Sequence, residues 1–330
     1  VLDARGVASG ATGHTVGLVP TGLPTSYARA VERYGRDTAQ AVWQLTVDNR
    51  SSLISVADER GVIVDRPGSL VMAMDENEAD LLKTSAGMLA ADGFDVSFEG
   101  GDPMGRGFKA ALTYPDDAVV DVAALTESLL QGFDVPVHPD TEVYGLLQDG
   151  DDVLVLARGR TVRARIVVLA VNAYAPLIDG YFADKVAPVR GYTLATEALD
   201  AGVIPTPGSA NSFLFRQTID GRLLFTSWPN QYETPAAGPD DERADVNLMQ
   251  FVGHHFPEAA NRFVKRESSM VGISRDGLPL IGAVPHLPQV FFVVGFAGCG
   301  LSLAYAAADL LAELITRGAE PELLSARRLE

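Results

Sequence analysis

Seven consecutive residues have the types and spacing to accept a developing negative charge. They are Phe296, Ala297, Gly298, Cys299, Gly300, Leu301 and Ser302. Gly295, Gly298 and Gly300 let the chain turn sharply and let another group approach its backbone. A turn that enters a helix presents free N–H groups and the positive end of the helix dipole. The pattern therefore predicts a seat for an anion, or for a ring that becomes anionic. The glycines could instead serve only close packing of a helix on a strand.

A second candidate region lies at the start of the chain. Asp3 follows two apolar residues, as does the acid that binds the ribose hydroxyls at the tip of a strand in dinucleotide-binding folds. The run Ser9–Leu18 is too polar for a core and too rich in glycine for a helix. Its backbone can approach a phosphate or a flavin closely.

The elements that position these residues follow from hydrophobic periodicity. Val290–Val294 is a buried strand, and the apolar spacing after Leu301 predicts a helix. The 290–308 stretch carries no charge, but its central glycines argue against a membrane span. In the first half of the chain, the pattern predicts a helix over 27–60 interrupted at Gly35, a strand over 63–73, and helices over 76–91 and 118–130. Two strands within 135–156 and a buried strand over 166–171 follow. The second half then predicts an antiparallel sheet from 186–196, 212–216 and 223–227, a polar loop over 235–245, and a helix ending at His254-His255.

The composition describes a soluble globular protein with room for two domains: 330 residues, 47% hydrophobic and 21% charged. The net charge of −17 disfavours nucleic acid and anionic membrane surfaces as partners. Cys299 is the only cysteine, which excludes an internal disulfide and favours a cytoplasmic location.

Four features in this order resemble the D-amino-acid oxidase/glycine oxidase (DAO) family of FAD-dependent oxidoreductases: the acid-tipped strand, the Ser9–Leu18 loop, the Asp276–Gly282 segment and the Gly295–Ser302 turn. The resemblance covers most of the chain and is weakest over 181–265. The segment Gly272–Pro279 resembles the gamma-glutamylputrescine oxidase-like branch. The family's first strand and glycine turn would precede Val1, so we expect an N-terminally truncated sequence that binds FAD weakly.

The resemblance implies an α/β fold with two domains. A Rossmann-like FAD-binding domain, with a parallel sheet and a β-meander, would comprise residues 1–61, 114–180 and 266–330. An α+β substrate domain with an antiparallel sheet would comprise residues 62–113 and 181–265.

The resemblance also implies which residues bind FAD. Asp3 would hold the ribose, and Ala4 and the backbone of Val143 would lie near the adenine. The residues that would line the phosphate and flavin are Ala11, Thr12, Val16, Gly17 and Leu18. Phe296–Ser302 would hold the flavin ring. The cysteine that carries covalent flavin in some members falls near Ser269, so we expect no attachment there.

The substrate residues depart from the family pattern. Amino-acid-oxidising members place an arginine ahead of the Asp276 segment, whereas residues 268–274 are uncharged here. Arg216 or Arg190 could bind a carboxylate from another direction, and Tyr192 or Trp228 could stack on an amine. Our candidate substrate residues are therefore Tyr192, Arg216 and Trp228.

The implied activity is oxidation of a primary or secondary amine, or of an N-substituted amino acid. A hydride passes from carbon to the flavin, water hydrolyses the resulting imine, and oxygen takes the electrons to give hydrogen peroxide. Two alternatives stay open: a dehydrogenase with another electron acceptor, and a non-catalytic flavoprotein subunit. No metal is expected, because His254-His255 has no partner at ligand spacing.

Overall fold

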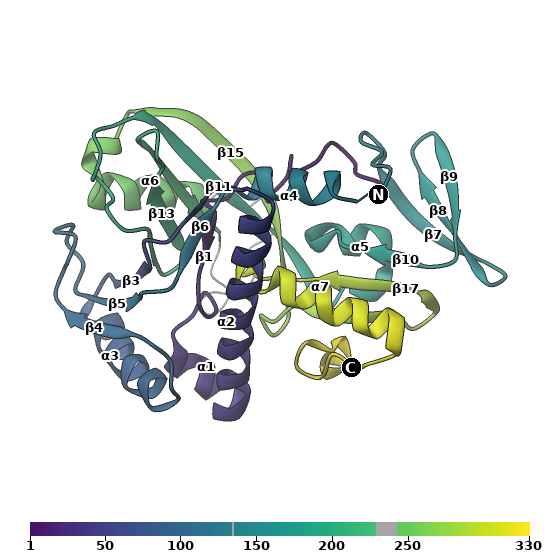
Figure 1. The fold of residues 1–330 in the computed structure, drawn as a ribbon, viewed down its shortest axis with the longest axis horizontal. Coiled ribbons are helices and arrows are strands. Elements are labelled where there is room, and N and C mark those ends of the chain that lie inside the picture. Colours follow the sequence, from purple (N-terminus) through teal and green to yellow (C-terminus); the bar gives the residue numbers. More distant parts are fainter. Residues whose placement is uncertain (134, 229–242) are drawn as a thin grey trace.

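The computed structural model describes residues 1–133, 135–228 and 243–330. The chain forms two lobes on either side of the long helix α2 (Arg36–Glu59), and both termini lie on the lobe that contains α7 (Gly300–Arg317) (Figure 1). Gly35, at φ 83°, separates α2 from α1 (Tyr27–Tyr34), which confirms the interruption expected there.

One lobe is built on an eight-stranded sheet. Its strands, in spatial order, are β15 (Phe263–Ser274), β11 (Val186–Ala198), β14 (Arg222–Ser227), β13 (Phe213–Gln217), β12 (Gly208–Ala210), β3 (Ser69–Ala73), β5 (Ala110–Tyr114) and β4 (Ser97–Gly100). Helix α6 (Arg243–His255) packs on one face through an aromatic core, and α3 (Glu76–Ala91) packs on the other face near β3 and β5. The antiparallel sheet expected from β11, β13 and β14 is confirmed.

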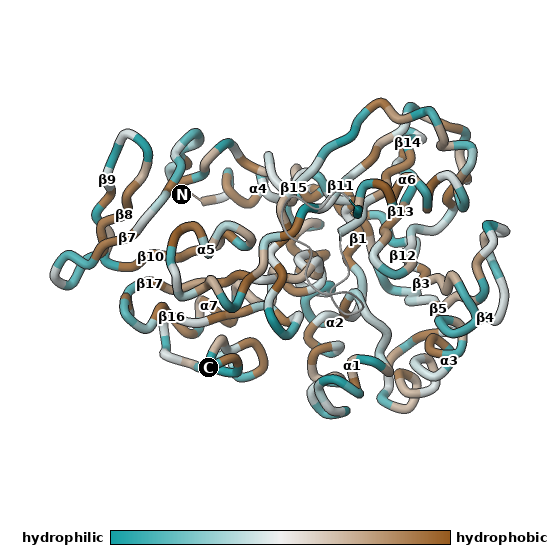
Figure 2. Tube along the Cα trace, turned by 180° about the vertical axis from the view of Figure 1, so that it is seen from behind, coloured by the Kyte–Doolittle hydropathy of each residue, from teal (hydrophilic) through white to brown (hydrophobic). Residues whose placement is uncertain are grey.

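The other lobe contains the strand, turn and helix predicted at the end of the chain. β17 (Leu287–Val294) pairs in parallel with β10 (Val167–Leu169) and antiparallel with β16 (Leu280–Val284), and α7 follows it. Hydrophobic residues run along β17 and α7 (Figure 2). A separate meander joins β7 (Val143–Asp149), β8 (Asp152–Ala157) and β9 (Arg160–Ala164), and the short helix α5 (Ala175–Ile178) lies nearby.

A small sheet lies beside α2 between the lobes. It consists of β1 (Leu18–Val19), β6 (Ala118–Val120) and β2 (Val64–Asp65), and helix α4 (Val122–Gln131) follows β6. The helix expected over 118–130 is therefore wrong at its start. Val119 and its neighbours pair with β1 and β2, and Asp121 then caps α4 by accepting a hydrogen bond from the Ala124 amide. Tertiary pairing overrides the local periodicity here.

A buried carboxylate fixes the segment that follows β1. Asp117 is fully buried and accepts hydrogen bonds from the Thr21 amide (3.0 Å), the Ser69 hydroxyl (2.6 Å) and the Arg50 guanidinium (3.0 Å). Burial raises the pKa of the Asp117 carboxyl, and these hydrogen bonds oppose that shift. Because Arg50 lies on α2 and Ser69 on β3, this one side chain connects α2 and the eight-stranded sheet to the end of β1.

Three other expectations concern a strand, a loop and a domain boundary. The strand over 166–171 is shorter and less buried than expected, since Ile166 and Val168 are 51% and 47% exposed. Residues 235–242 of the expected polar loop lie outside the described residues, and α6 begins at Arg243. The domain boundary at 266 falls inside β15, which pairs along β11 up to Ser274. Within the described residues, no helix is long and apolar enough to cross a bilayer.

Candidate flavin and substrate site

The turn between β17 and α7 adopts a conformation that few sequences tolerate. Gly295, Ala297 and Gly298 all have positive φ, at 76°, 51° and 86°. The Cys299 amide donates to the Phe296 carbonyl at 2.8 Å, which closes the turn just before the helix starts. The Cys299 thiol also donates to that carbonyl and does not cap the helix. The first amides of α7 are therefore left without a side-chain acceptor in the described chain.

Ser302 adds a hydroxyl to this helix end. Its side chain is 1% exposed, and its Oγ has no hydrogen-bond partner among the described residues. Buried hydroxyls are almost always paired, so an unpaired one beside free helix amides indicates a missing acceptor. The positive end of the helix dipole makes an electron-rich acceptor the best fit.

Two segments that are far from the turn in the sequence form hydrogen bonds with its backbone amides. Asn172, just after β10, accepts hydrogen bonds through Oδ1 from the amides of Gly295 (2.9 Å) and Phe296 (3.2 Å). The amide of Ala297 donates to the carbonyl of Gly272 on β15 at 2.9 Å. The turn is thus fixed by β10 and by β15 at once.

One face of the eight-stranded sheet points toward this turn. The pairing of Thr193 with Thr226, and of Thr226 with Leu214, puts these three residues on the same face, and Arg216 and Trp228 follow by alternation. Trp228 is 7% exposed and packs with Val189, Ile273 and Ala297. This face of the eight-stranded sheet therefore packs against the turn between β17 and α7.

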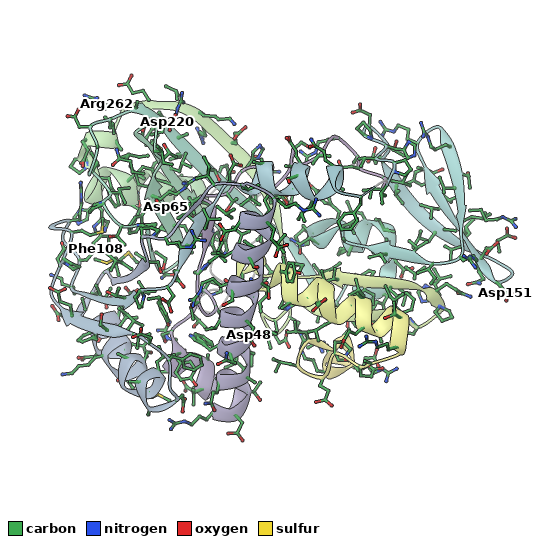
Figure 3. The ribbon with its side chains drawn as sticks, in the orientation of Figure 1. Asp48, Asp65, Phe108, Asp151, Asp220 and Arg262 are labelled. Atoms are coloured by element: carbon green, nitrogen blue, oxygen red, sulfur yellow. The ribbon has the colours of Figure 1, made fainter. Side chains whose placement is uncertain are left out.

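Arg216 is a half-buried cation for which the described part of the chain provides no partner. It makes no hydrogen bond or ion pair with the described residues, and its Nε is buried and unpaired. Burial lowers the pKa of its guanidinium, while Asp121, Asp65 and Asp220 act in the opposite direction from beyond contact distance. Asp65, labelled in Figure 3, is the last residue of β2 in the small sheet beside α2. A guanidinium in this state favours an anionic ligand.

The N-terminal loop lies against the same face of the sheet. The Thr193 hydroxyl donates to the His14 carbonyl at 2.8 Å, and His14 Nε2 lies 3.3 Å from the Glu267 carboxylate on β15. Val16 and Leu18 pack with Leu214. Gly17, at φ 75°, has no room for a side chain between Val120 and Arg216. The loop therefore lies beside the candidate substrate residues.

The residues expected at the adenine and ribose also meet. The Thr141 amide donates to the Asp3 carbonyl at 2.8 Å, so Asp3 and Ala4 lie beside the segment that leads into Val143 at the start of β7. Asp3 Oδ1 accepts a hydrogen bond from the Arg5 amide at 2.8 Å. Ala11 is half-buried and Thr12 exposed on the outer turn of the loop. The cofactor roles of these residues stay predictions.

Tyr192 does not join the other substrate candidates. It pairs with Ser227 and faces α6, where it packs in the core with Phe225 and Leu248. Arg216 and Trp228 lie on the opposite face of the sheet. The alternation of a strand buried on both faces does not reveal which face lines a site, and a substrate role for Tyr192 stays a prediction. Arg190 is exposed and donates to the Ser268 hydroxyl at 3.2 Å.

Two residues that the structure brings to the site have no role predicted from sequence patterns. Asn172 is separated from Gly295 by 123 positions, and nothing local marks it as a brace. His14 stood within the quoted loop, but its contact with Glu267 depends on how the loop docks. The single signal for His14 was its placement in a run of small residues.

These features fit FAD. The helix start carries amides and a Ser302 hydroxyl that has no hydrogen-bond partner among the described residues, and both suit the electron-rich edge of a flavin ring. At the other end, Asp3 lies beside Thr141, two positions before Val143. Residues 1–314 match a family model described as "DAO: FAD dependent oxidoreductase".

Individual relatives agree with this match. A glycine oxidase from Pseudomonas aeruginosa is 31% identical over 226 residues, which cover 66% of this chain and 61% of the relative. A probable oxidoreductase OrdL from Rhizobium meliloti is 24% identical over 98% of this chain and 79% of its own length. The chain thus spans less than two thirds of the glycine oxidase.

Solved structures share the fold at lower identity. Glycine oxidase from Geobacillus kaustophilus superposes with a TM-score of 0.78 at 20% identity, covering 96% of this chain and 87% of its own. Iminodiacetate oxidase from Chelativorans sp. BNC1 gives 0.76 at 19% identity, covering 98% and 91%.

Proposed function

The chain belongs to the DAO family of FAD-dependent oxidoreductases, and from that premise we propose that it oxidises a primary or secondary amine or an N-substituted amino acid. The observation that carries the proposal is the uncapped start of α7 with the buried hydroxyl of Ser302, which has no partner among the described residues, directly after a turn on which Trp228 packs. Bound FAD would supply the hydride acceptor.

The protein's part in this reaction is orientation and electrostatics. The α7 amides and the Ser302 hydroxyl would stabilise negative charge on the edge of the ring, and their positions are fixed before the reaction by the turn. Trp228, which is almost fully buried, keeps water from that side of the turn. No acid–base pair is needed for this scheme.

Arg216 supports a substrate that carries an anionic group. β15 residues 268–274 are uncharged, so no cation lies where amino-acid-oxidising members place their arginine. Arg216 instead approaches from β13, beside Gly17 and on the face shared with Thr226. We propose that it binds a carboxylate remote from the reacting nitrogen, because a half-buried guanidinium can hold a carboxylate through two parallel hydrogen bonds.

The names of the relatives are consistent with this class. Glycine oxidase and iminodiacetate oxidase act, by their names, on small molecules that contain both an amine nitrogen and a carboxylate. For this chain we expect a higher kcat/KM with an amine whose carboxylate is distant than with glycine, sarcosine or a simple D-amino acid. A screen with separate readouts for peroxide release and for dye reduction also distinguishes oxygen from another electron acceptor.

The test is a screen of purified, FAD-loaded protein against these substrate classes. Peroxide release reports an oxidase, and reduction of an artificial dye without peroxide reports a dehydrogenase. The proposal requires turnover of at least one amine by either readout. A protein that binds FAD but oxidises no amine or amino acid would have the non-catalytic role instead.

A further inference from the structure

We propose that Asn172 is a positioning residue for the flavin, acting through the turn between β17 and α7. This inference rests on the proposed function, because it assigns to Asn172 the shape of the turn that would meet the ring. Asn172 follows β10, whose partner β17 leads into the turn. Its Oδ1 accepts from the amides of Gly295 and Phe296, at 2.9 and 3.2 Å.

These two hydrogen bonds fall directly before a residue in a strained conformation. Ala297 has φ 51°, in the left-handed region that alanine rarely adopts. Such a conformation persists only when the surroundings fix it. Asn172 fixes the first half of the turn, and the Gly272 carbonyl fixes Ala297 at 2.9 Å.

Asn172 is itself held in place with little freedom. Its φ is 42°, a left-handed conformation that asparagine tolerates better than most residues. A Cβ on Gly272 would lie 2.6 Å from Asn172 Oδ1 and 2.7 Å from the Ala173 amide nitrogen. Asn172 is therefore wedged between β15 and the turn, and its position determines where the helix amides point.

The amide side chain is suited to this position for an electrostatic reason. A carboxylate at residue 172 could accept the same two hydrogen bonds, but it would place a negative charge behind the turn. That charge would oppose negative charge on the ring in front of it. Asparagine supplies the acceptor without the charge, so the two properties can be separated by substitution.

The experiment compares N172A and N172D with wild-type protein and with N261A as a control. Asn261 also has positive φ, at 64°, but it lies on an exposed turn before β15. N261A therefore reproduces the backbone cost of alanine in this conformation without touching the flavin turn. For each protein the Kd for FAD is measured by titration, and the reduction potential of the bound FAD is measured spectroscopically.

N172A should weaken FAD binding by roughly tenfold or more, since two hydrogen bonds to the turn are lost. N172D should restore most of the affinity but shift the reduction potential to a more negative value. N261A should match wild type in both. A purely structural role would lower stability without the potential shift in N172D. If N172A proves too unstable to purify, the potential of N172D carries the test.

The inference is wrong if N172A binds FAD as wild type does, or if N172D leaves the potential unchanged. Either result, with wild-type protein that binds FAD and turns over an amine, leaves the proposed function intact. Wild-type protein that binds FAD but oxidises no amine contradicts the proposed function alone.

Discussion

The indole ring of Trp228 lies against the α-carbon of Gly298, so closely that a Cβ on residue 298 would be 2.5 Å from the ring. Trp228 directly follows the strand β14 of one lobe, and Gly298 belongs to the turn before α7 in the other. The contact therefore sets the distance between the eight-stranded sheet and the turn between β17 and α7.

Gly298→Ala should disrupt this contact. The new methyl group would overlap the indole, and φ 86° is unfavourable for alanine, so we expect a loss of about 2–4 kcal/mol in the free energy of unfolding. Urea denaturation of the protein without FAD measures it. Gly300→Ala is the control, because a Cβ there meets nothing within 4 Å. Equal stability of the two variants would contradict the close contact.

Arg216→Met should raise KM for substrates with a carboxylate by roughly 10–100-fold, because a charge-assisted hydrogen bond contributes about 1.5–3 kcal/mol. KM for the methyl ester of the same substrate should be unchanged, because the ester has no carboxylate. Steady-state kinetics with the acid and ester pair measures the effect, and Arg190→Met, which alters an exposed arginine, is the control. An equal rise in KM for acid and ester would show that Arg216 has only a structural role.

Stability should fall below neutral pH because of His255. This residue is 6% exposed, its ring stacks on Phe108 at 4.3 Å, and its Nδ1 lies 2.8 Å from the Arg106 carbonyl (Figure 3 labels Phe108). Burial lowers the pKa of His255 below its ordinary value. The unfolded chain then binds the proton more readily, so the stabilisation is complete above about pH 6.5 and is lost as pH falls.

His255→Phe should remove this part of the pH dependence. Wild-type protein should lose up to about 1.4 kcal/mol more per pH unit between pH 6.5 and the lowered pKa. Urea denaturation at several pH values gives the slope, which is the readout because the variant also loses a hydrogen bond. His254→Phe, at the exposed neighbouring ring, should keep the wild-type slope. An identical slope in His255→Phe would contradict the prediction.

Cys299 should be unreactive in the folded protein. Burial raises the pKa of its thiol to about 12, and the side chain is 3% exposed. Since the thiolate is the reactive form, a thiol reagent at pH 8 should label the native protein far more slowly than the urea-unfolded chain. Cys299 is the only cysteine, so the labelling stoichiometry reports it directly. Rapid labelling of native protein would show that the turn opens.

Local sequence patterns predicted the elements whose start and end depend on neighbouring residues. The run Val290–Val294, the glycines after it and the apolar spacing from Leu301 gave the strand, turn and helix in their observed order. Helix α3 was predicted with its observed bounds, because Asp75 caps its start and Asp92-Gly93 ends it. In each case the signal lies within a few residues of the element.

Contacts between segments that lie far apart in the chain could not be predicted from the sequence. Ala118–Val120 became a strand because β1 and β2 flank it, and Tyr192 faced the core because of how β11 lies between β14 and β15. The hydrogen bonds of Asn172 to the turn cross 123 positions. Periodicity determines that residues alternate, but tertiary packing determines which face meets the site.

The most direct test of the account is anaerobic mixing of FAD-loaded protein with an amine that carries a distant carboxylate. Loss of the visible absorption band of oxidised FAD reports transfer of electrons from the substrate, whatever acceptor follows. We predict that this band disappears with that amine, and that Arg216→Met requires a much higher substrate concentration for the same bleaching. A band that persists with every amine and amino acid tested would contradict the assignment as an amine oxidoreductase.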